Sequence, residues 1–371
     1  MISLGLYVHF PWCVKKCPYC DFNSHELNSG FPEEEYVATL LEDLHDDAPL
    51  FNRPIDSVFF GGGTPSLFSP ESFDQVLSEA QRLLPFSEKA EITLEANPGA
   101  LDMSHINGYR DAGINRLSLG AQSFNDQHLK SLGRIHSSDD ITQAISAARA
   151  AGFDNINLDL MHGLPYQKWV DAEKDLMRAI AFEPEHISWY QLTIEPNTVF
   201  HRYPPVLPGE SMLLEIYDRG MEVLAAHGYT RYEISAFSRS DRRSKHNTNY
   251  WQFGDYIGIG AGAHGKYTSD QQIFRTTKTR LPRDYLKAPN KKTTRVPESE
   301  ITLEYMINAL RLVDGTSLGN FEDRTGLPQV AITKFLEQAK TLGFIEKEVP
   351  GHIVPTNKGL RFVDEVLLLL D

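Results

Sequence analysis

The three cysteines of this chain, Cys13, Cys17 and Cys20, all lie within one window of eight residues, with the spacing C-x3-C-x2-C. Cysteines that only fill a core would be scattered along the sequence, so the cluster indicates a metal site. Thiolates bind soft or borderline metals, including zinc and iron–sulfur clusters. Three thiolates can hold three corners of a cubane cluster and leave its fourth iron without a protein ligand. Such an open iron can bind a small molecule and pass an electron into it.

A structural zinc ion is the main alternative for these cysteines. Zinc takes four protein ligands in structural sites, and His9 or His25 could supply the fourth. A disulfide is disfavoured, because the number of cysteines is odd and the chain has the features of an intracellular protein.

The size and composition limit the class of protein. A chain of 371 residues, 41% hydrophobic and 23% charged, has room for one large soluble domain and a smaller one. The amino terminus lacks the basic start and apolar run of a signal peptide, and no apolar stretch approaches the ~20 residues that cross a bilayer. We therefore expect a cytoplasmic location. The net charge of −14 disfavours a general role in nucleic-acid binding, although a local basic patch would escape that argument.

Six apolar strands alternate with helices over the first half of the chain. The expected strands lie at residues 4–9, 56–60, 91–95, 116–120, 155–160 and 186–192. The expected helices lie between them, at residues 33–47, 70–84, 103–112, 138–151 and 171–182. This alternation predicts an α/β fold with a parallel sheet and right-handed crossovers. We expect a partial parallel β/α barrel of six units, with a flat doubly wound sheet as the alternative.

The second half of the chain is less regular. A helix is expected at 210–227, a strand at 229–234, a glycine-rich segment at 257–263 and a linker at 287–294. Helices at 299–312, 318–325 and 328–342, followed by a hairpin of residues 343–346 and 352–355, predict a winged-helix-like module. The module lacks a dense arginine or lysine stripe, which favours packing or partner binding over DNA binding. The predicted domains are a barrel core at 1–235, a connecting region at 236–295 and the helical C-terminal module at 296–371.

Glycines and polar residues gather at or just after the carboxyl ends of the predicted strands. In parallel sheets and barrels, ligands bind at this edge. A single glycine run is often only a tight turn, and a single polar residue often caps a helix or pairs locally. Several such residues on one rim nevertheless predict a ligand site. They are Gly62, Gly63, Thr64, Glu95, Gln122, Arg134 and Asp159.

Four motifs stand in order along the chain: YVHFPWC at 7–13, GGGTP at 61–65, GAQSF at 120–124 and NLDLMHGLP at 157–165. Together with the cysteine spacing, they resemble the radical S-adenosylmethionine (SAM) family. Within it, they are most similar to the oxygen-independent coproporphyrinogen III oxidase branch, and there to the HemW family of haem chaperones. The similarity covers nearly the whole length, including the C-terminal module.

The resemblance implies roles for individual residues. Cys13, Cys17 and Cys20 would ligate a [4Fe–4S] cluster whose open iron chelates SAM, and reduction of the cluster would release a 5′-deoxyadenosyl radical. Tyr7, Gly62 and Glu95 would contact that SAM. A second SAM site of the oxidase is matched by Tyr19, Gly63, Thr64, Gln122, Arg134 and Asp159. Whether a second SAM binds to this chain is open.

Two departures from the oxidase disfavour decarboxylation of propionate side chains. The oxidase carries a further cysteine two residues after the third, and this chain has Phe22 there. The chain also begins almost at its first strand, so it is expected to lack the amino-terminal extension that helps enclose the porphyrinogen.

A further motif concerns haem. His246 and Tyr250 belong to the sequence His-Asn-Thr-Asn-Tyr, which is followed by Trp251. Histidine and tyrosine are both axial ligands of haem iron, and a tryptophan could lie against the porphyrin face. An asparagine-rich surface turn is the simpler interpretation. The HemW family carries an H-N-x-x-Y motif at this point, to which haem binding is attributed, and the resemblance therefore favours His246, with Tyr250 second.

The resemblance thus implies a haem chaperone that delivers haem to haem-requiring proteins, among them respiratory enzymes at the membrane. The expected cofactors are a [4Fe–4S] cluster, SAM and haem, and the expected partners are an electron donor such as a flavodoxin and a second copy of the chain. The alternative is an oxygen-independent coproporphyrinogen III oxidase, which would be an enzyme whose protein orients the substrate and excludes water. A weaker alternative is a zinc-stabilised barrel without a redox role.

Overall fold

One twelve-stranded sheet organises the computed structural model, which describes residues 2–27, 30–100, 104–239 and 241–370. The strand order is β14-β13-β12-β11-β1-β4-β5-β6-β7-β8-β10-β9. Neighbouring strands from β11 to β8 are parallel, and the outer strands are antiparallel. The parallel strands are β1 (Leu4–Phe10), β4 (Ile55–Gly62), β5 (Phe86–Ala96), β6 (Arg116–Gln122), β7 (Ile156–His162), β8 (His186–Gln191) and β11 (Asp255–Ile259).

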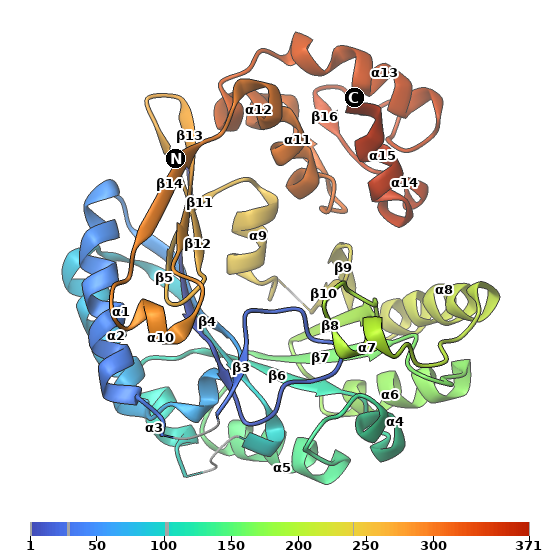
Figure 1. Cartoon of the computed structure of the whole chain (residues 1–371). Helices are drawn as coiled ribbons and strands as arrows, with labels where there is room; N and C mark the ends of the chain where they lie inside the picture. The colour runs from blue at the N-terminus through green and yellow to red at the C-terminus, as the bar shows by residue number, and fades with distance from the viewer. Residues whose placement is uncertain (1, 28–29, 101–103, 240, 371) are drawn as a thin grey trace.

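The order of the parallel strands decides between the two predicted architectures. From β1 to β8 each strand lies beside its predecessor, whereas a doubly wound sheet reverses direction from its first strand. Crossovers of one hand then place the helices on one face, and Figure 1 shows them outside a curved sheet. The partial barrel is confirmed, and the flat doubly wound alternative is wrong. The covering helices are α1 (Glu33–Asp47), α2 (Pro70–Leu83), α3 (Ile106–Asp111), α5 (Ser138–Ala150), α6 (Trp169–Ala181) and α8 (Glu210–Ala226).

The local sequence explains where these helices form. In α1, three glutamates occupy the first turn, where they complement the helix dipole, and Tyr36, Leu40 and Leu44 are buried at a spacing of four residues. In α5, Ser137 and Asp140 form a capping box that satisfies two backbone N–H groups. The predicted start of a helix at residue 103 lies outside the described residues, and α4 (Asp126–Ser131) was not predicted.

The interior of the barrel is polar below the carboxyl ends of the strands. His186 is buried and contacts Asn157 Oδ1 at 2.6 Å and Tyr232 Oη at 2.8 Å. Asn157 Nδ2 donates to Ser118 Oγ at 2.7 Å and to Asp159 Oδ1 at 2.8 Å. This network connects the barrel floor to the strand ends, where the predicted ligand rim lies.

The predicted linker at 287–294 is wrong in its second half. Residues 291–295 form β14 (Lys291–Arg295), which pairs antiparallel with β13 (Gln272–Lys278) at the edge of the sheet. Its sequence, KKTTR, is polar because an exposed edge strand carries charged side chains, and it therefore resembles a loop. The remaining antiparallel strands are β12 (His264–Ser269), β10 (Ala236–Ser238) and β9 (Thr230–Glu233), and β9 confirms the strand expected at 229–234.

The interpretation of the His-Asn-Thr-Asn-Tyr segment as a surface turn is also wrong. It lies in helix α9 (Lys245–Trp251), whose His246 and Asn249 are buried. Ser244 caps the helix by accepting a hydrogen bond from Asn247 N at 3.3 Å. Figure 1 shows α9 between the barrel and the C-terminal module.

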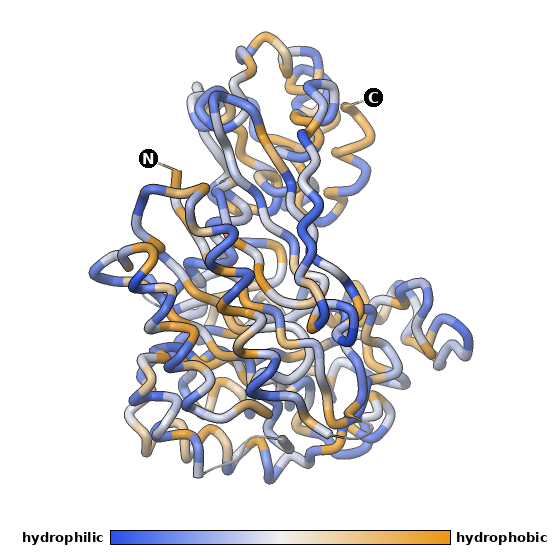
Figure 2. The backbone as a smooth tube through the Cα atoms, turned by 60° about the vertical axis from the view of Figure 1, so that its left-hand side comes forward, coloured by the Kyte–Doolittle hydropathy of each residue, from blue (hydrophilic) through white to orange (hydrophobic). Residues whose placement is uncertain are grey.

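The C-terminal residues form a helical module with a small antiparallel sheet. Its helices include α11 (Glu298–Ala309), α12 (Leu318–Thr325), α13 (Thr333–Thr341), α14 (Asn357–Arg361) and α15 (Val363–Leu367). The predicted hairpin is short, with one bridge between Ile345 and Pro355, and β16 (His352–Ile353) pairs with β15 (Thr316–Ser317). Figure 2 shows this module standing above the barrel. Phe253 and Ile273 extend from the barrel side into the module core, and the domain boundaries stay a prediction.

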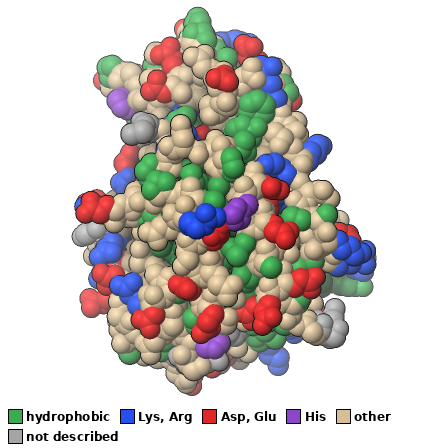
Figure 3. All heavy atoms as spheres, turned by 90° about the vertical axis from the view of Figure 1, so that its left-hand side faces the viewer, with side chains coloured by type: hydrophobic (Ala, Val, Ile, Leu, Met, Phe, Trp, Pro, Cys, Tyr) green, Lys and Arg blue, Asp and Glu red, His purple; other side chains and the backbone are tan. Residues whose placement is uncertain are grey.

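Two further observations concern the charges on the surface and the lengths of the helices. On the face in Figure 3, acidic and basic side chains are interspersed. Among the described residues, no helix has both the length and the apolar character needed to cross a membrane.

Candidate functional site

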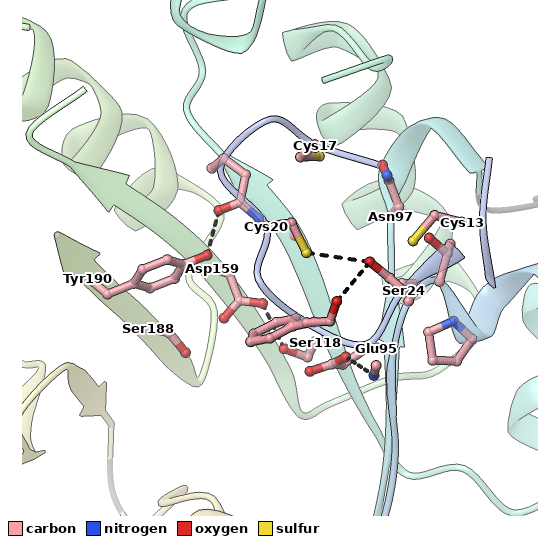
Figure 4. A pocket seen from close by; sticks show the side chains of 18 of the residues that line it. Cys13, Cys17, Cys20, Ser24, Glu95, Asn97, Ser118, Asp159, Ser188 and Tyr190 are labelled. Atoms are coloured by element: carbon pink, nitrogen blue, oxygen red, sulfur yellow. Dashed lines mark hydrogen bonds between the residues drawn. The ribbon is translucent and has the colours of Figure 1, made fainter. Parts of the chain in front are cut away.

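A cavity of about 510 Å³ lies at the carboxyl ends of the parallel strands, beneath the cysteine loop. Figure 4 shows the three cysteines on one side of it and the strand-end side chains of Glu95, Ser118 and Asp159 on another. All the predicted site residues except Tyr7, His246 and Tyr250 line this cavity. They are Cys13, Cys17, Tyr19, Cys20, Gly62, Gly63, Thr64, Glu95, Gln122, Arg134 and Asp159.

The cysteine loop is held by its own backbone and by the barrel. The short strand β2 (Trp12–Cys13) pairs with β3 (His25–Glu26), and Cys20 N donates to Cys17 O at 3.1 Å. Lys16 Nζ donates to the carbonyls of Phe22 and Ser24 across the loop. The thiols are therefore presented by a loop that is closed on itself.

The three thiols are free and partly exposed toward the cavity. Burial raises the pKa of the Cys13 thiol. Arg134 Nη1 lies 3.6 Å from Cys17 Sγ, so a guanidinium is placed to offset the charge of a thiolate. In the part of the chain that is described, no three His, Cys, Asp or Glu side chains converge on a single-ion site. A cubane does not require such convergence, because each thiolate binds a different iron atom. The residues present thus fit a cluster.

Glycine is required after β4 by close backbone packing. A Cβ on Gly63 would lie 2.4 Å from Trp12 O, and one on Gly62, whose φ is +116°, would lie 2.5 Å from His9 Cε1. Gly63 N donates to Phe10 O at 2.6 Å and Thr64 N donates to Trp12 O at 2.7 Å. The run is thus a tight turn against β1 and also a wall of the cavity.

We expect Gly63→Ala to lower the free energy of unfolding by about 2 kcal/mol or more, because its methyl group would overlap backbone atoms that cannot move independently. Urea denaturation measures the change. Gly209→Ala is the matched control, since a Cβ there meets no atom within 4 Å. Equal midpoints for the two variants would contradict the packing explanation.

Two carboxyl groups at the strand ends have perturbed acidity. Burial, together with the charge of Asp159, raises the pKa of Glu95 to about 8, and Gly62 N donates to Glu95 Oε2 at 3.1 Å. Burial also raises the pKa of Asp159, which accepts from Ser118 Oγ at 3.0 Å. A cationic ligand in the cavity would stabilise the ionised form of Glu95, so the site is suited to an ammonium or sulfonium group.

Gln122 and Arg134 are positioned by partners that the sequence did not reveal. Gln122 is the last residue of β6, with φ of +67°, and its Oε1 accepts from Tyr190 Oη at 2.8 Å. Arg134 Nη2 donates to Gly120 O at 2.9 Å. Tyr190 was missed. It lies two residues after Ser188 on β8, on the same face of the strand, and both line the cavity.

Tyr7, His246 and Tyr250 lie behind the cavity, around a second cavity of about 210 Å³ that Glu95 and Asp159 also line. His246 is 2% exposed, and burial lowers its pKa to about 3. Its Nε2 lies 2.9 Å from Tyr250 Oη, its Nδ1 lies 3.4 Å from Ser57 Oγ, and its ring stacks on Phe59. Both ring nitrogens thus face polar partners in this conformation.

Two more lining residues, Glu233 of β9 and Arg311 of the segment after α11, were also missed. Trp251 of α9, which the sequence analysis placed near a porphyrin, lines the same cavity. No local pattern marks Arg311, because its position depends on the docking of the C-terminal module.

Comparisons with known proteins identify the family of the chain. Residues 7–179 match the family model described as the radical SAM superfamily, and residues 296–362 match the HemN C-terminal domain. The chain is 45% identical to "Heme chaperone HemW" of Haemophilus influenzae, covering 99% of this chain and 97% of that protein. It is 44% identical to "Heme chaperone HemW" of Escherichia coli, with the same coverage.

The structure is similar to that of coproporphyrinogen III oxidase (HemN) from Escherichia coli, with a TM-score of 0.83, 22% identity and coverage of 100% of this chain and 90% of that chain. At this identity the similarity shows the fold alone, and it confirms the barrel with its C-terminal module. The chain belongs to the HemW family of the radical SAM superfamily.

Proposed function

We propose that this protein is a haem chaperone that binds haem and delivers it to haem-requiring proteins, respiratory enzymes at the membrane among them. The observation that carries the proposal is the similarity, along nearly the entire chain, to relatives that are named haem chaperones. A cytoplasmic location, a flavodoxin-like electron donor and a homodimer belong to the same proposal.

Cys13, Cys17 and Cys20 would hold a [4Fe–4S] cluster, with Arg134 supplying positive charge beside Cys17. When bound, the cluster supplies an open iron for SAM and an electron for radical formation. Gly62 and Glu95 would contact SAM in the main cavity, and Tyr7 would contribute from behind it. A second SAM subsite would be lined by Tyr19, Gly63, Thr64, Gln122, Arg134 and Asp159.

His246 and Tyr250 are the proposed haem ligands. Because His246 is buried, its Nε2 must first leave Tyr250 Oη, and α9 must move away from Phe59. Four cavities border α9, so the helix has open space beside it into which it can move. Haem uptake is therefore expected to be coupled to a rearrangement of α9.

An oxygen-independent coproporphyrinogen III oxidase is the second candidate, because the fold is shared with that enzyme. The position where the oxidase carries its further cysteine is Phe22, whose side chain is exposed at the cavity. A phenyl ring can neither ligate iron nor transfer a proton, so it cannot replace a thiol there.

We expect no protoporphyrinogen when the reconstituted protein is incubated anaerobically with coproporphyrinogen III, SAM and a reductant. The products are separated by chromatography, and an authentic oxidase run in parallel shows that the assay works. Turnover at a rate comparable to that of the oxidase would contradict a function limited to haem delivery.

A further inference from the structure

Unpartnered polar atoms gather on the wall of the main cavity that faces away from the cysteine loop. Within the described residues, the buried side-chain atoms without a hydrogen-bond partner include Glu233 Oε2, Trp251 Nε1 and Arg311 Nε. All three residues line the same cavity. A buried polar group without a partner is costly, so the two donors among these atoms, Trp251 Nε1 and Arg311 Nε, indicate an acceptor that is still to be bound, while Glu233 Oε2 faces Arg311 as an ion-pair partner.

Arg311 is brought to this wall by the backbone. Leu312 forms an antiparallel bridge with Glu233, and Val313 N donates to Tyr232 O at 3.0 Å. These contacts join the end of α11 to β9. The C-terminal module is thus attached to the barrel at the point where its arginine enters the cavity.

The guanidinium of Arg311 makes one cation–π contact and one long ion pair. Its Cζ lies 4.3 Å from the centre of the Trp251 ring, a cation–π contact. Its Nη2 lies 3.6 Å from Glu233 Oε2, which is longer than a hydrogen bond, and the side chain is 31% exposed. Arginine can donate five hydrogen bonds in a planar fork, so this one retains capacity for a carboxylate.

The distribution of charge along the cavity restricts where a ligand's carboxylate can lie. Glu95 and Asp159 line the same cavity and offer a carboxylate no positive charge, whether they are ionised or neutral. The other cations that line the cavity belong with the cysteine loop: Lys15 is part of that loop, and Arg134 is engaged through Nη1 by Cys17 Sγ and through Nη2 by Gly120 O, although its Nε has no partner. Arg311 therefore provides the favourable position for an anionic substituent at the far wall.

We propose that Arg311, together with Trp251, forms a subsite for a carboxylate substituent of the bound tetrapyrrole, and that Glu233 occupies this arginine until the ligand arrives. The inference rests on the proposed haem-binding function and adds a role for the C-terminal module. The ligand carboxylate would pair with Arg311, and the ring would lie along Trp251. Burial raises the pKa of Glu233, so this side chain can become neutral once the arginine turns to the ligand.

The test compares a dicarboxylate with its ester. The reconstituted protein is titrated with haem, with haem dimethyl ester and with metal-free mesoporphyrin IX, all in the same detergent.

Arg311→Gln is expected to weaken binding of both diacids by about tenfold, the size of one charge-assisted interaction, and to leave the ester within about twofold. Glu233→Gln should strengthen binding of the diacids and leave the ester unchanged. Arg361→Gln, an exposed arginine of the same module paired with Asp218, is the matched control and should change nothing.

Each outcome bears on the subsite. Equal effects of Arg311→Gln on diacid and ester, or no effect at all, would overturn it and leave haem binding standing. If Arg311→Gln perturbs folding, the test uses Arg311→Lys and Glu233→Gln instead. If the wild-type protein prefers the diacids to the ester and neither of these variants changes that preference, the subsite is contradicted. Arg311-dependent binding of mesoporphyrin without any binding of haem would support the subsite and reject the haem function. No binding of any tetrapyrrole would reject both.

Discussion

Replacing Cys17 with serine is expected to reduce the iron and sulfide of the anaerobically reconstituted protein to near background. The three thiolates of one closed loop are the only protein ligands that we propose for the cluster. A protein with two of these thiolates is therefore not expected to retain the cluster. Cys17 is also the thiol next to Arg134, whose Nη1 lies 3.6 Å from its sulfur. A hydroxyl group is a poor ligand for this soft site and would leave the guanidinium without a charged partner.

The control for this variant keeps all three thiols and changes a neighbour. Ser24 is buried, and its Oγ lies 3.6 Å from Cys20 Sγ, so Ser24→Ala should retain iron and sulfide. Wild-type levels of both elements in Cys17→Ser would contradict the cluster assignment. One zinc ion and no sulfide in the wild-type protein would support the structural zinc site instead.

Replacing His246 with alanine is expected to weaken haem binding by at least about tenfold and to leave the iron–sulfur content intact, since changes one shell beyond a metal ligand already cost 10–100-fold. The imidazole lies behind the cavity, and its hydrogen-bond and stacking partners, Ser57, Tyr250 and Phe59, lie outside the cysteine loop. Titrations followed at the Soret band, with iron and sulfide measured on the same samples, separate the two effects.

A buried imidazole cannot be removed without some loss of stability, because Tyr250 Oη and Ser57 Oγ lose a partner. His162→Ala is the matched control: His162 is also buried in the barrel, packs 4.3 Å from the Trp189 ring and lies outside both cavities. It should lose stability without losing haem affinity. Unchanged haem titrations for His246→Ala would remove the motif from the proposed site.

Much of the barrel could be predicted because each strand and helix carries its own signal. Helices α1 and α12 begin and end where the sequence predicts, since acidic first turns, caps and apolar spacing are local features. Parallel strands in chain order also bring their carboxyl ends to one edge. For that reason, Glu95, Gln122 and Asp159, which come from three different strands, line one cavity as expected.

The remaining features depend on contacts distant in sequence. The edge strand β14 resembles a linker because only its pairing with β13 makes it a strand. Helix α9 looks like a polar turn, and its burial follows from its position between the barrel and the C-terminal module. Arg311 reaches the cavity only because the segment after α11 pairs with β9, more than seventy residues away. None of these contacts leaves a periodic pattern in the sequence.

The central claim is that this radical SAM scaffold handles haem. The most direct measurement is a haem titration of the anaerobically reconstituted wild-type protein, followed at the Soret band. We predict tight, near-stoichiometric binding. The absence of any Soret shift in protein with a full complement of iron and sulfide would contradict the claim and would favour radical catalysis on another substrate, with porphyrinogens tested first.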